Sequence, residues 1–396
     1  YKTVRLIRGE KGTKVVLTVI PAADISGSVT VTIDLIRDEV RLEDQAATGR
    51  VDVVIGPDGS TNRIGVIRLP AFYSDMRNRL NGRGKEFRSS TRDVARILAD
   101  MKAAGVQGML LDLRNNGGGS LAEAVEMTGL FIPAGPIVQV RERSHVQVLS
   151  DPDPGVLYTG PLVVLVNRAS ASASEILAGA LQDYGRAVIV GDSKTHGKGT
   201  VQSLQRLDER NDKLGSLKVT THTFHRIVGA STQLKGIVPD VVIPSVLDAM
   251  EIGEEFLPNP MPWTVVNAAG YRRVDELEPL LPKLRQRSEE RQATDPALVA
   301  HRKLLEQIRE RQRTTEISLN LEERLKLAQA EKALEEAQSA ALEFANDDLP
   351  ARTPRGERPP DPVLEEAKRI LVDLLGLRRQ EERHETALLE NARRGQ

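Results

Sequence analysis

Cysteine is absent from this chain of 396 residues. The absence excludes disulfide bonds, thiolate metal sites and cysteine nucleophiles, but it does not fix the cellular compartment. Long apolar runs are absent too: none approaches the ~20 residues of a membrane-spanning helix, which excludes a membrane span here and leaves peripheral association open. No signal peptide is visible either, although the chain opens on Tyr1 rather than methionine, which suggests a fragment or a processed form.

An excess of charge of either sign is also lacking. With 55 Lys and Arg residues against 56 Asp and Glu residues, the formal net charge is −1, so nucleic-acid binding has no overall electrostatic support. The composition that remains is typical of a globular protein, with 40% hydrophobic and 28% charged residues. The length predicts two or three folded units.

The middle of the chain, from residue 64 to about 245, has an α/β pattern. Apolar strand-like runs alternate with segments in which apolar residues recur at helical spacing. In order, these are a strand at 64–69, a helix at 89–104, a strand at 109–113, a helix at 121–131, and two further strand–helix steps around Val164 and Ile189. Such alternation predicts an α/β core of crossover units on a central sheet.

The segment before this core favours β structure. Residues 3–7 and 14–19 are predicted as two short strands, and residues 22–60 alternate Val, Ile and Thr with polar residues. One hairpin cannot hold a core by itself. The opening segment is therefore expected either to pack on the rest of the chain or to be the remnant of a divided domain.

The C-terminal part changes character. Residues 246–270 are proline-rich and loop-like around Trp263, and from residue 272 the chain is helical and highly charged. A long helix is predicted at 321–344, where a packed or solvated helical arm is favoured over a coiled coil. Residues 349–362, with five prolines, are predicted as a linker, and 363–377 as a final amphipathic helix.

A serine-rich turn is the first chemical feature. Ser170-Ala-Ser-Ala-Ser-Glu175 follows the apolar run 162–166 and leads into a helical pattern. A serine at a strand-to-helix turn is suited to nucleophilic catalysis if a neighbouring base removes its proton. Ser172 and Glu175 also fit a capping box, which any helix can use, and the two interpretations are compatible because one turn serves both.

Lys198 is the candidate base. Burial lowers the pKa of a lysine, and a shift from ~10.4 to ~7.5 would take roughly 4 kcal/mol. The flanking glycines, Gly197 and Gly199, would let the backbone pack closely around it, and Gln202 is placed to bind and direct the neutral amine. Lys194, in the same loop but without flanking glycines, is the weaker alternative.

Histidine, the usual base, has less support in this chain. None of the six histidines lies in a recognisable triad setting, and only one shares the loop of Lys198. They are His145, His196, His222, His225, His301 and His384, of which His196 is the one in that loop.

Besides a nucleophile and a base, a serine hydrolase needs hydrogen-bond donors that stabilise the oxyanion of the tetrahedral intermediate. The segment 112–119 ends a strand with three glycines before a helix, so it can present backbone N–H groups without side-chain obstruction. The Ala173 N–H would lie at a helix N-terminus, where negative charge is favoured. No Lys-Ser/Thr pair follows the glycines, which argues against a P-loop.

Three of these stretches, in this order, resemble motifs of the carboxy-terminal processing peptidases, also called tail-specific proteases. They are Leu113-Arg-Asn-Asn-Gly-Gly-Gly119, Ser170-Ala-Ser-Ala-Ser-Glu175 and Gly197-Lys-Gly-Thr-Val-Gln202. The resemblance implies a ClpP/crotonase-like α/β fold and a serine endopeptidase that needs no metal or cofactor. It implies Ser172 as nucleophile, Lys198 as base, Gln202 as the residue that orients the lysine, and Gly118 and Ala173 as oxyanion donors. The loop 191–197 is one residue longer than the commonest family version, which keeps Lys194 under consideration.

The resemblance also divides the chain. Residues 1–21 look like the last third of a PDZ domain, 22–245 like the serine peptidase core, and 246–396 like the helical C-terminal region of Prc-type members. Such members work in the bacterial periplasm on proteins with unstructured apolar C-termini, and some operate with a lipoprotein adaptor. Nucleic acid is not among their partners.

Two other classes of function are compatible with parts of the sequence. An inactive peptide-binding scaffold on the same fold is the main alternative, because the truncated PDZ segment would lack its carboxylate-binding loop. An acyl-CoA enzyme on a related α/β fold has little support, since nothing in that chemistry accounts for Lys198 and Gln202.

Overall fold

The computed structural model describes most of the chain. The described residues are 2–20, 29–38, 46–75, 87–143, 145–208, 214–274, 277–314, scattered positions between 316 and 337, and 361–394. They form two compact units, Tyr1–Gln45 and Ala46–Gln396.

The first unit consists of a short helix and a hairpin. Helix α1 spans Lys2–Ile7, and strand β1 (Lys14–Val19) pairs antiparallel with β2 (Val31–Ile36). The predicted strand at 3–7 is therefore wrong. The guanidinium of Arg37 donates to the carbonyl oxygens of Leu6 and Ile7 at 3.0 and 2.8 Å, and such a cation satisfies the last carbonyls of a helix. The pairing of β2 with β1 also places residues 31–36 in this unit; its PDZ identity stays a prediction.

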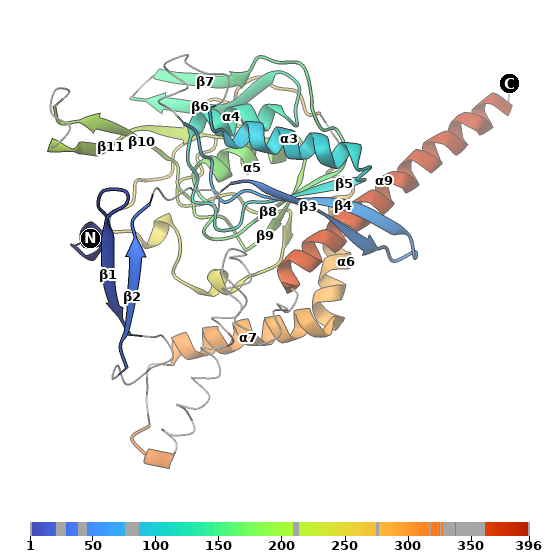
Figure 1. Ribbon diagram of the computed structural model, residues 1–396. Helices are drawn as coiled ribbons and strands as arrows, with labels where there is room; N and C mark the ends of the chain where they lie inside the picture. Colours follow the sequence, from blue (N-terminus) through green and yellow to red (C-terminus); the bar gives the residue numbers. More distant parts are fainter. Residues whose placement is uncertain are drawn as a thin grey trace. The chain divides into compact units, whose positions relative to one another are not determined.

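A six-stranded sheet is the frame of the second unit (Figure 1). Its strands, in spatial order, are β12 (Val241–Val242), β9 (Val188–Gly191), β8 (Leu162–Val166), β5 (Gly108–Asp112), β4 (Thr61–Arg68) and β3 (Thr48–Ile55). All neighbours are parallel except β3, which runs antiparallel to β4. The predicted α/β core is thus confirmed.

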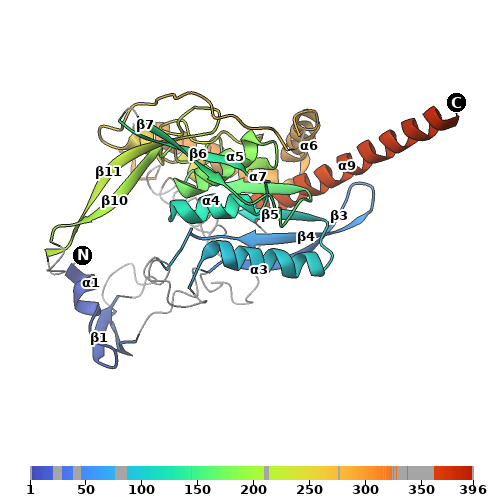
Figure 2. The same cartoon turned by 90° about the horizontal axis from the view of Figure 1, so that it is seen from above.

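Helices cover both faces of this sheet, which explains why its central strands are apolar at every position. On one face lie α3 (Ser90–Ala103), α4 (Leu121–Gly129) and α5 (Ala173–Asp183), packed on alternate residues of the strands. Figure 2 shows α3 and α4 beside β4 and β5. The other face is covered by α9 (Pro362–Arg394) together with α6 (Leu281–Thr294).

Helix α9 begins close to the predicted final helix but is much longer, extending to Arg394. Its first sixteen residues carry an apolar stripe that includes Leu371, whose side chain packs against Gly108 of β5. Pro362, assigned to the linker, is the first helical residue, where proline is favoured. The rest of the linker, 349–360, and nearly all of the predicted helix 321–344 lie outside the described residues.

A second sheet was not predicted. It is antiparallel, with the order β10 (Thr200–Arg206), β11 (Ser216–His225), β6 (Gly135–Glu142) and β7 (His145–Asp151). Strand β10 starts two residues after Lys198, so this sheet fixes the direction in which the chain leaves the candidate lysine.

The segment after β12 is largely irregular, as predicted. It contains the short turns η3 (Val246–Ala249) and η4 (Glu254–Phe256) before α6 and α7 (Pro296–Arg313). Within the described ranges, no helix has both the length and the apolar character of a membrane span.

Candidate active site

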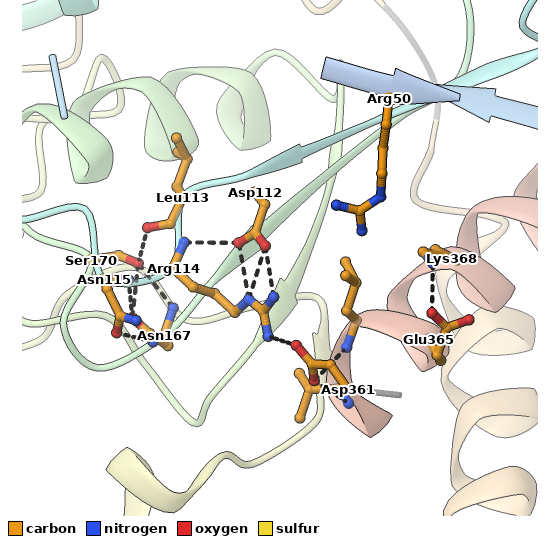
Figure 3. A network of polar contacts seen from close by, with 12 residues as sticks. Arg50, Asp112, Leu113, Arg114, Asn115, Asn167, Ser170, Asp361, Glu365 and Lys368 are labelled. Carbon is orange, nitrogen blue, oxygen red and sulfur yellow. Dashed lines mark hydrogen bonds and ion pairs between the residues drawn. The ribbon is translucent and has the colours of Figure 1, made fainter. Parts of the chain in front are cut away.

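The carboxyl ends of strands β5 and β8 are neighbours in the sheet, so the loops after these two strands meet. The Asn115 N–H donates to Asn167 Oδ1 at 3.0 Å, and Asn167 Nδ2 donates back to Asn115 Oδ1 at 2.8 Å. Figure 3 shows this pair beside Ser170, whose hydroxyl donates to the Leu113 carbonyl at 2.8 Å. The glycine-rich loop and the serine-rich turn are thereby joined into one rigid assembly.

Ser172 has a strained backbone. Its φ of 57° and ψ of −110° lie outside the regions that side-chain-bearing residues normally occupy. Such a conformation costs about 1–3 kcal/mol and persists only where its neighbours over-determine it. Here the Asn116 carbonyl accepts hydrogen bonds from the Ala171 N–H at 3.0 Å and from the Ser174 hydroxyl at 2.9 Å, one on each side of the turn.

Only the middle serine of the turn faces open space. Ser170 and Ser174 are fully buried, and their hydroxyls bond to backbone carbonyls. Ser172 lines a cavity of about 1180 Å³ that also receives Lys198 and Gln202. The arrangement therefore brings the three predicted catalytic side chains to one cavity.

Glu175 connects the serine turn to the lysine loop. Its Oε2 accepts the N–H groups of Ser172 and Lys198 at 2.7 and 3.0 Å. Its Oε1 accepts the Gly197 N–H at 2.7 Å and the Thr195 hydroxyl at 2.6 Å. The sequence predicted the bond from Glu175 to the Ser172 N–H, which belongs to the capping box. It did not predict the bonds to the lysine loop, because they join residues about twenty positions apart.

The Glu175 carboxyl group is fully buried. Burial raises its pKa to about 7, and the four hydrogen bonds oppose that shift because they favour the carboxylate. The group therefore changes protonation state close to neutral pH while it holds both candidate catalytic residues.

Lys198 is partly buried, and burial lowers the pKa of its amine. Lys218, which is on β11 and lines the same cavity, lowers the pKa of Lys198 further through charge repulsion. Lys198 Nζ lies 3.5 Å from Gln202 Oε1, consistent with the orienting role predicted for Gln202. No hydrogen bond joins Lys198 Nζ to Ser172 Oγ; in unliganded enzymes such bonds are often long and shorten only when substrate binds.

Lys194 faces a different environment. Its ammonium pairs with Glu255 at 2.7 Å and donates to the Leu234 carbonyl at 2.8 Å. It is not among the side chains that line the cavity of Ser172. The structure thus does not bring Lys194 to the serine.

Histidine does not reach this cavity either. His196 lines a separate cavity of about 510 Å³ that shares Lys198 and Gln202 with the first. Burial lowers the pKa of its imidazole, and its Nδ1 has no hydrogen-bond partner.

The two candidate oxyanion donors differ. The Ala173 N–H, at the first position of α5, donates to no group among the described residues. The Gly118 N–H donates to Asn116 Oδ1 at 2.9 Å, so it would have to exchange this bond to serve an oxyanion. Asn116 is itself anchored, because its Nδ2 donates to the Leu69 carbonyl at 2.8 Å.

The cavity wall beside Ser172 is mostly apolar. The apolar side chains in its lining include Leu121, Val125, Ile176, Val201 and Phe224, and the charged residues in its lining include Glu126, Asp151 and Lys218. Such a wall suits an apolar substrate side chain. In the part of the chain that the structure describes, no group of three or more His, Asp or Glu side chains could hold a metal ion.

Comparison with known proteins gives two family matches. Residues 63–243 match "Peptidase family S41", and residues 247–376 match "C-terminal domain of tail specific protease". The chain is 36% identical over 393 residues to a tail-specific protease of Haemophilus influenzae, covering 94% of this chain and 52% of that protein. It is 35% identical over 239 residues to a carboxyl-terminal-processing protease of Picosynechococcus, covering 60% of this chain and 50% of that protein.

Among solved structures, the photosystem II D1 C-terminal processing protease is 29% identical, with 60% of this chain and 57% of that chain covered and a TM-score of 0.43. The chain spans about half the length of the curated relatives it matches.

Proposed function

Because the chain belongs to the tail-specific protease family, with a peptidase S41 domain over residues 63–243, we propose that it is a serine endopeptidase with Ser172 as nucleophile and Lys198 as general base. The observation that carries the proposal is the Glu175 carboxylate, one oxygen of which accepts the backbone N–H groups of both residues. Two candidate catalytic residues from separate motifs are thereby held at one cavity.

In the acylation step, neutral Lys198 takes the proton of the Ser172 hydroxyl as its oxygen attacks the substrate carbonyl. The negative charge that forms on the carbonyl oxygen is stabilised by the Ala173 N–H. The Gly118 N–H also stabilises it after this group has given up its hydrogen bond to Asn116 Oδ1. The Lys198 ammonium then gives its proton to the departing amine, which leaves an ester on Ser172.

Hydrolysis reverses the proton path. Water replaces the amine product, and Lys198 removes a proton from this water as its oxygen attacks the ester carbonyl. The Lys198 ammonium then returns the proton to Ser172 Oγ as the ester bond breaks, which restores the Ser172 hydroxyl and releases the carboxylic acid. The lowered pKa of Lys198 favours this chemistry because more of the amine is neutral near physiological pH. Gln202 fixes the direction of the amine through its 3.5 Å contact.

The proposed substrates are proteins with unstructured, apolar C-terminal tails. The apolar cavity wall beside Ser172 and the names of the relatives support this class. We further propose a periplasmic location, a PDZ-type origin for residues 1–21 and cooperation with a lipoprotein adaptor, all by analogy with the family.

Substitution of the two catalytic candidates tests the proposal. Ser172→Ala and Lys198→Ala should each abolish cleavage of an unfolded protein such as casein while their circular dichroism spectra stay unchanged. A fluorophosphonate probe should label the parent chain at Ser172. Lys194→Ala is the matched lysine control and should leave measurable activity. An active Lys198→Ala protein would refute the assigned base, and a folded parent chain that neither cleaves nor labels would favour the inactive scaffold.

A further inference from the structure

Two buried arginines occupy equivalent places in the candidate active site. Arg114 lies two residues beyond the end of β5 and four residues before Gly118. Arg168 lies two residues beyond the end of β8 and four residues before Ser172. Both are less than one-tenth exposed, so each guanidinium needs acidic or carbonyl partners inside the protein.

Arg114 is held by two acids that are far apart in sequence. It donates to both oxygens of Asp112, with Nη2 at 2.7 Å from Oδ2, and Nη1 donates to Asp361 Oδ2 at 2.6 Å. Figure 3 shows the guanidinium between these two carboxylates. Asp361 also caps α9, since its Oδ1 accepts the N–H groups of Val363 and Leu364 at 3.0 and 3.1 Å. The glycine-rich loop is thus fastened to the first turn of α9.

Arg168 is held in the same way by another acid. Its Nη2 donates to Glu255 Oε1 at 2.6 Å and also to the Ile252 carbonyl, and its side chain is 5% exposed. Glu255 Oε1 pairs at the same time with Lys194, in the loop that carries the candidate base. One carboxylate therefore contacts the segments before both Ser172 and Lys198.

Asp361 and Glu255 come from the C-terminal region, whereas both arginines belong to the peptidase domain. Asp112, the second acid that holds Arg114, also belongs to the peptidase domain. Glu255 and Asp361 lie within residues 247–376, and Arg114 and Arg168 within residues 63–243.

Without the Asp361 charge, the buried Arg114 keeps only Asp112 as an acidic partner. Without the Glu255 charge, the buried guanidinium of Arg168 keeps only carbonyl oxygens among the described residues. Each guanidinium then loses part of the charge compensation that offsets its burial, and we expect the loop that carries it to shift. A displacement of about 1 Å in a catalytic group costs on the order of 10²-fold in rate.

We propose that the C-terminal region completes the catalytic site: Asp361 and Glu255 are positioning residues that hold the glycine-rich loop and the serine turn through Arg114 and Arg168. The inference rests on the proposed peptidase function. The C-terminal region would thereby influence the rate at which Ser172 is acylated, in addition to covering one face of the six-stranded sheet.

The test measures the rate of fluorophosphonate labelling of Ser172, together with kcat and KM on a peptide, in the full chain carrying Asp361→Asn or Glu255→Gln. Glu365→Gln is the matched control, because Glu365 lies in the same first turn of α9 and pairs with Lys368 instead of a loop arginine. Asp361→Glu keeps the negative charge and tests whether the charge restores the labelling rate that Asp361→Asn loses. Thermal unfolding of each variant is measured in parallel.

Each neutral variant should lose at least tenfold in labelling rate and in kcat, with a smaller change in KM, while the control stays within twofold of the parent. Asp361→Glu should recover part of the rate. If Asp361→Asn does not fold, Glu255→Gln decides alone. A folded neutral variant that labels within twofold of the parent would overturn the inference but not the peptidase function. A folded parent chain that neither labels nor cleaves would refute the proposed function and this inference with it.

Discussion

Gly118 lies directly against Ser172: a Cβ on Gly118 would come within 2.8 Å of the Ser172 Cβ and 2.9 Å of the Ala171 carbonyl. The φ of Gly118 is +102°, a region that residues with side chains rarely adopt. Both constraints arise from the close approach of the glycine-rich loop to the serine turn.

Gly118→Ala should therefore lose on the order of 10²-fold in kcat, because the loop must withdraw from Ser172. Gly117→Ala is the control, since a Cβ there meets no atom within 4 Å. Peptide hydrolysis by both variants checks the prediction. Equal activities of the two variants would show that the close approach does not matter for catalysis.

Glu175→Gln should reduce both stability and activity. Each carboxylate oxygen accepts two hydrogen bonds, so a glutamine must turn its NH₂ group toward one pair of donors. We expect a loss of roughly 1–3 kcal/mol in the free energy of unfolding and at least tenfold in kcat. Urea unfolding and peptide hydrolysis measure the two effects. Glu289→Gln, at an exposed position of α6, should change neither.

The raised pKa of Glu175 predicts a pH-dependent stability difference. Its folded-state pKa is about 7 against an ordinary value of 4.5, so the folded protein binds this proton more tightly than the unfolded chain. The stability that the protonated group contributes is fully present below pH 4.5 and is lost as the pH rises through 7, by roughly 3 kcal/mol. The free energy of unfolding of the parent minus that of Glu175→Gln should fall over this range. A difference that is flat from pH 4.5 to 8 would contradict the assignment.

Lys218→Ala should shift the pH profile of kcat/KM to higher pH. Lys218 lowers the pKa of Lys198 by charge repulsion, and its removal lets Lys198 keep its proton to a higher pH. The neutral base, and with it the activity, would then appear later as the pH rises. Lys102→Ala, at an exposed position of α3, should leave the profile in place. A shift toward lower pH for Lys218→Ala would rule out Lys198 as the titrating base.

The α/β core was predictable because strands such as 109–113 and 162–166 are apolar at nearly every position, a pattern that arises when helices cover both faces of a sheet. Ser172, Lys198 and Gln202 were predictable as a set because Ser172 stands at a strand-to-helix turn, Lys198 lies between two glycines, and the two motifs resemble those of one peptidase family. Their shared cavity supports the assignment, while their catalytic roles stay predictions.

Other features depend on contacts that no local pattern contains. Residues 3–7 have the composition of a strand but form a helix whose last carbonyls bind Arg37, thirty positions later. The bonds from Glu175 to the lysine loop and from Arg114 to Asp361 likewise join segments that the sequence separates. Each of these features includes a contact between residues that are distant in the sequence, which a local pattern cannot reveal.

Helix α9 has a consequence for how this unit assembles. Arg114 and Asp361 are 247 positions apart, and Asn62 and Arg379, which are also hydrogen-bonded, are 317 apart. Loops of this size close slowly, and the apolar face that α9 covers stays open to water until residues 362–377 have been synthesised. Nascent chains of this protein should therefore be prone to aggregate or to bind chaperones until the last part of this unit has been made.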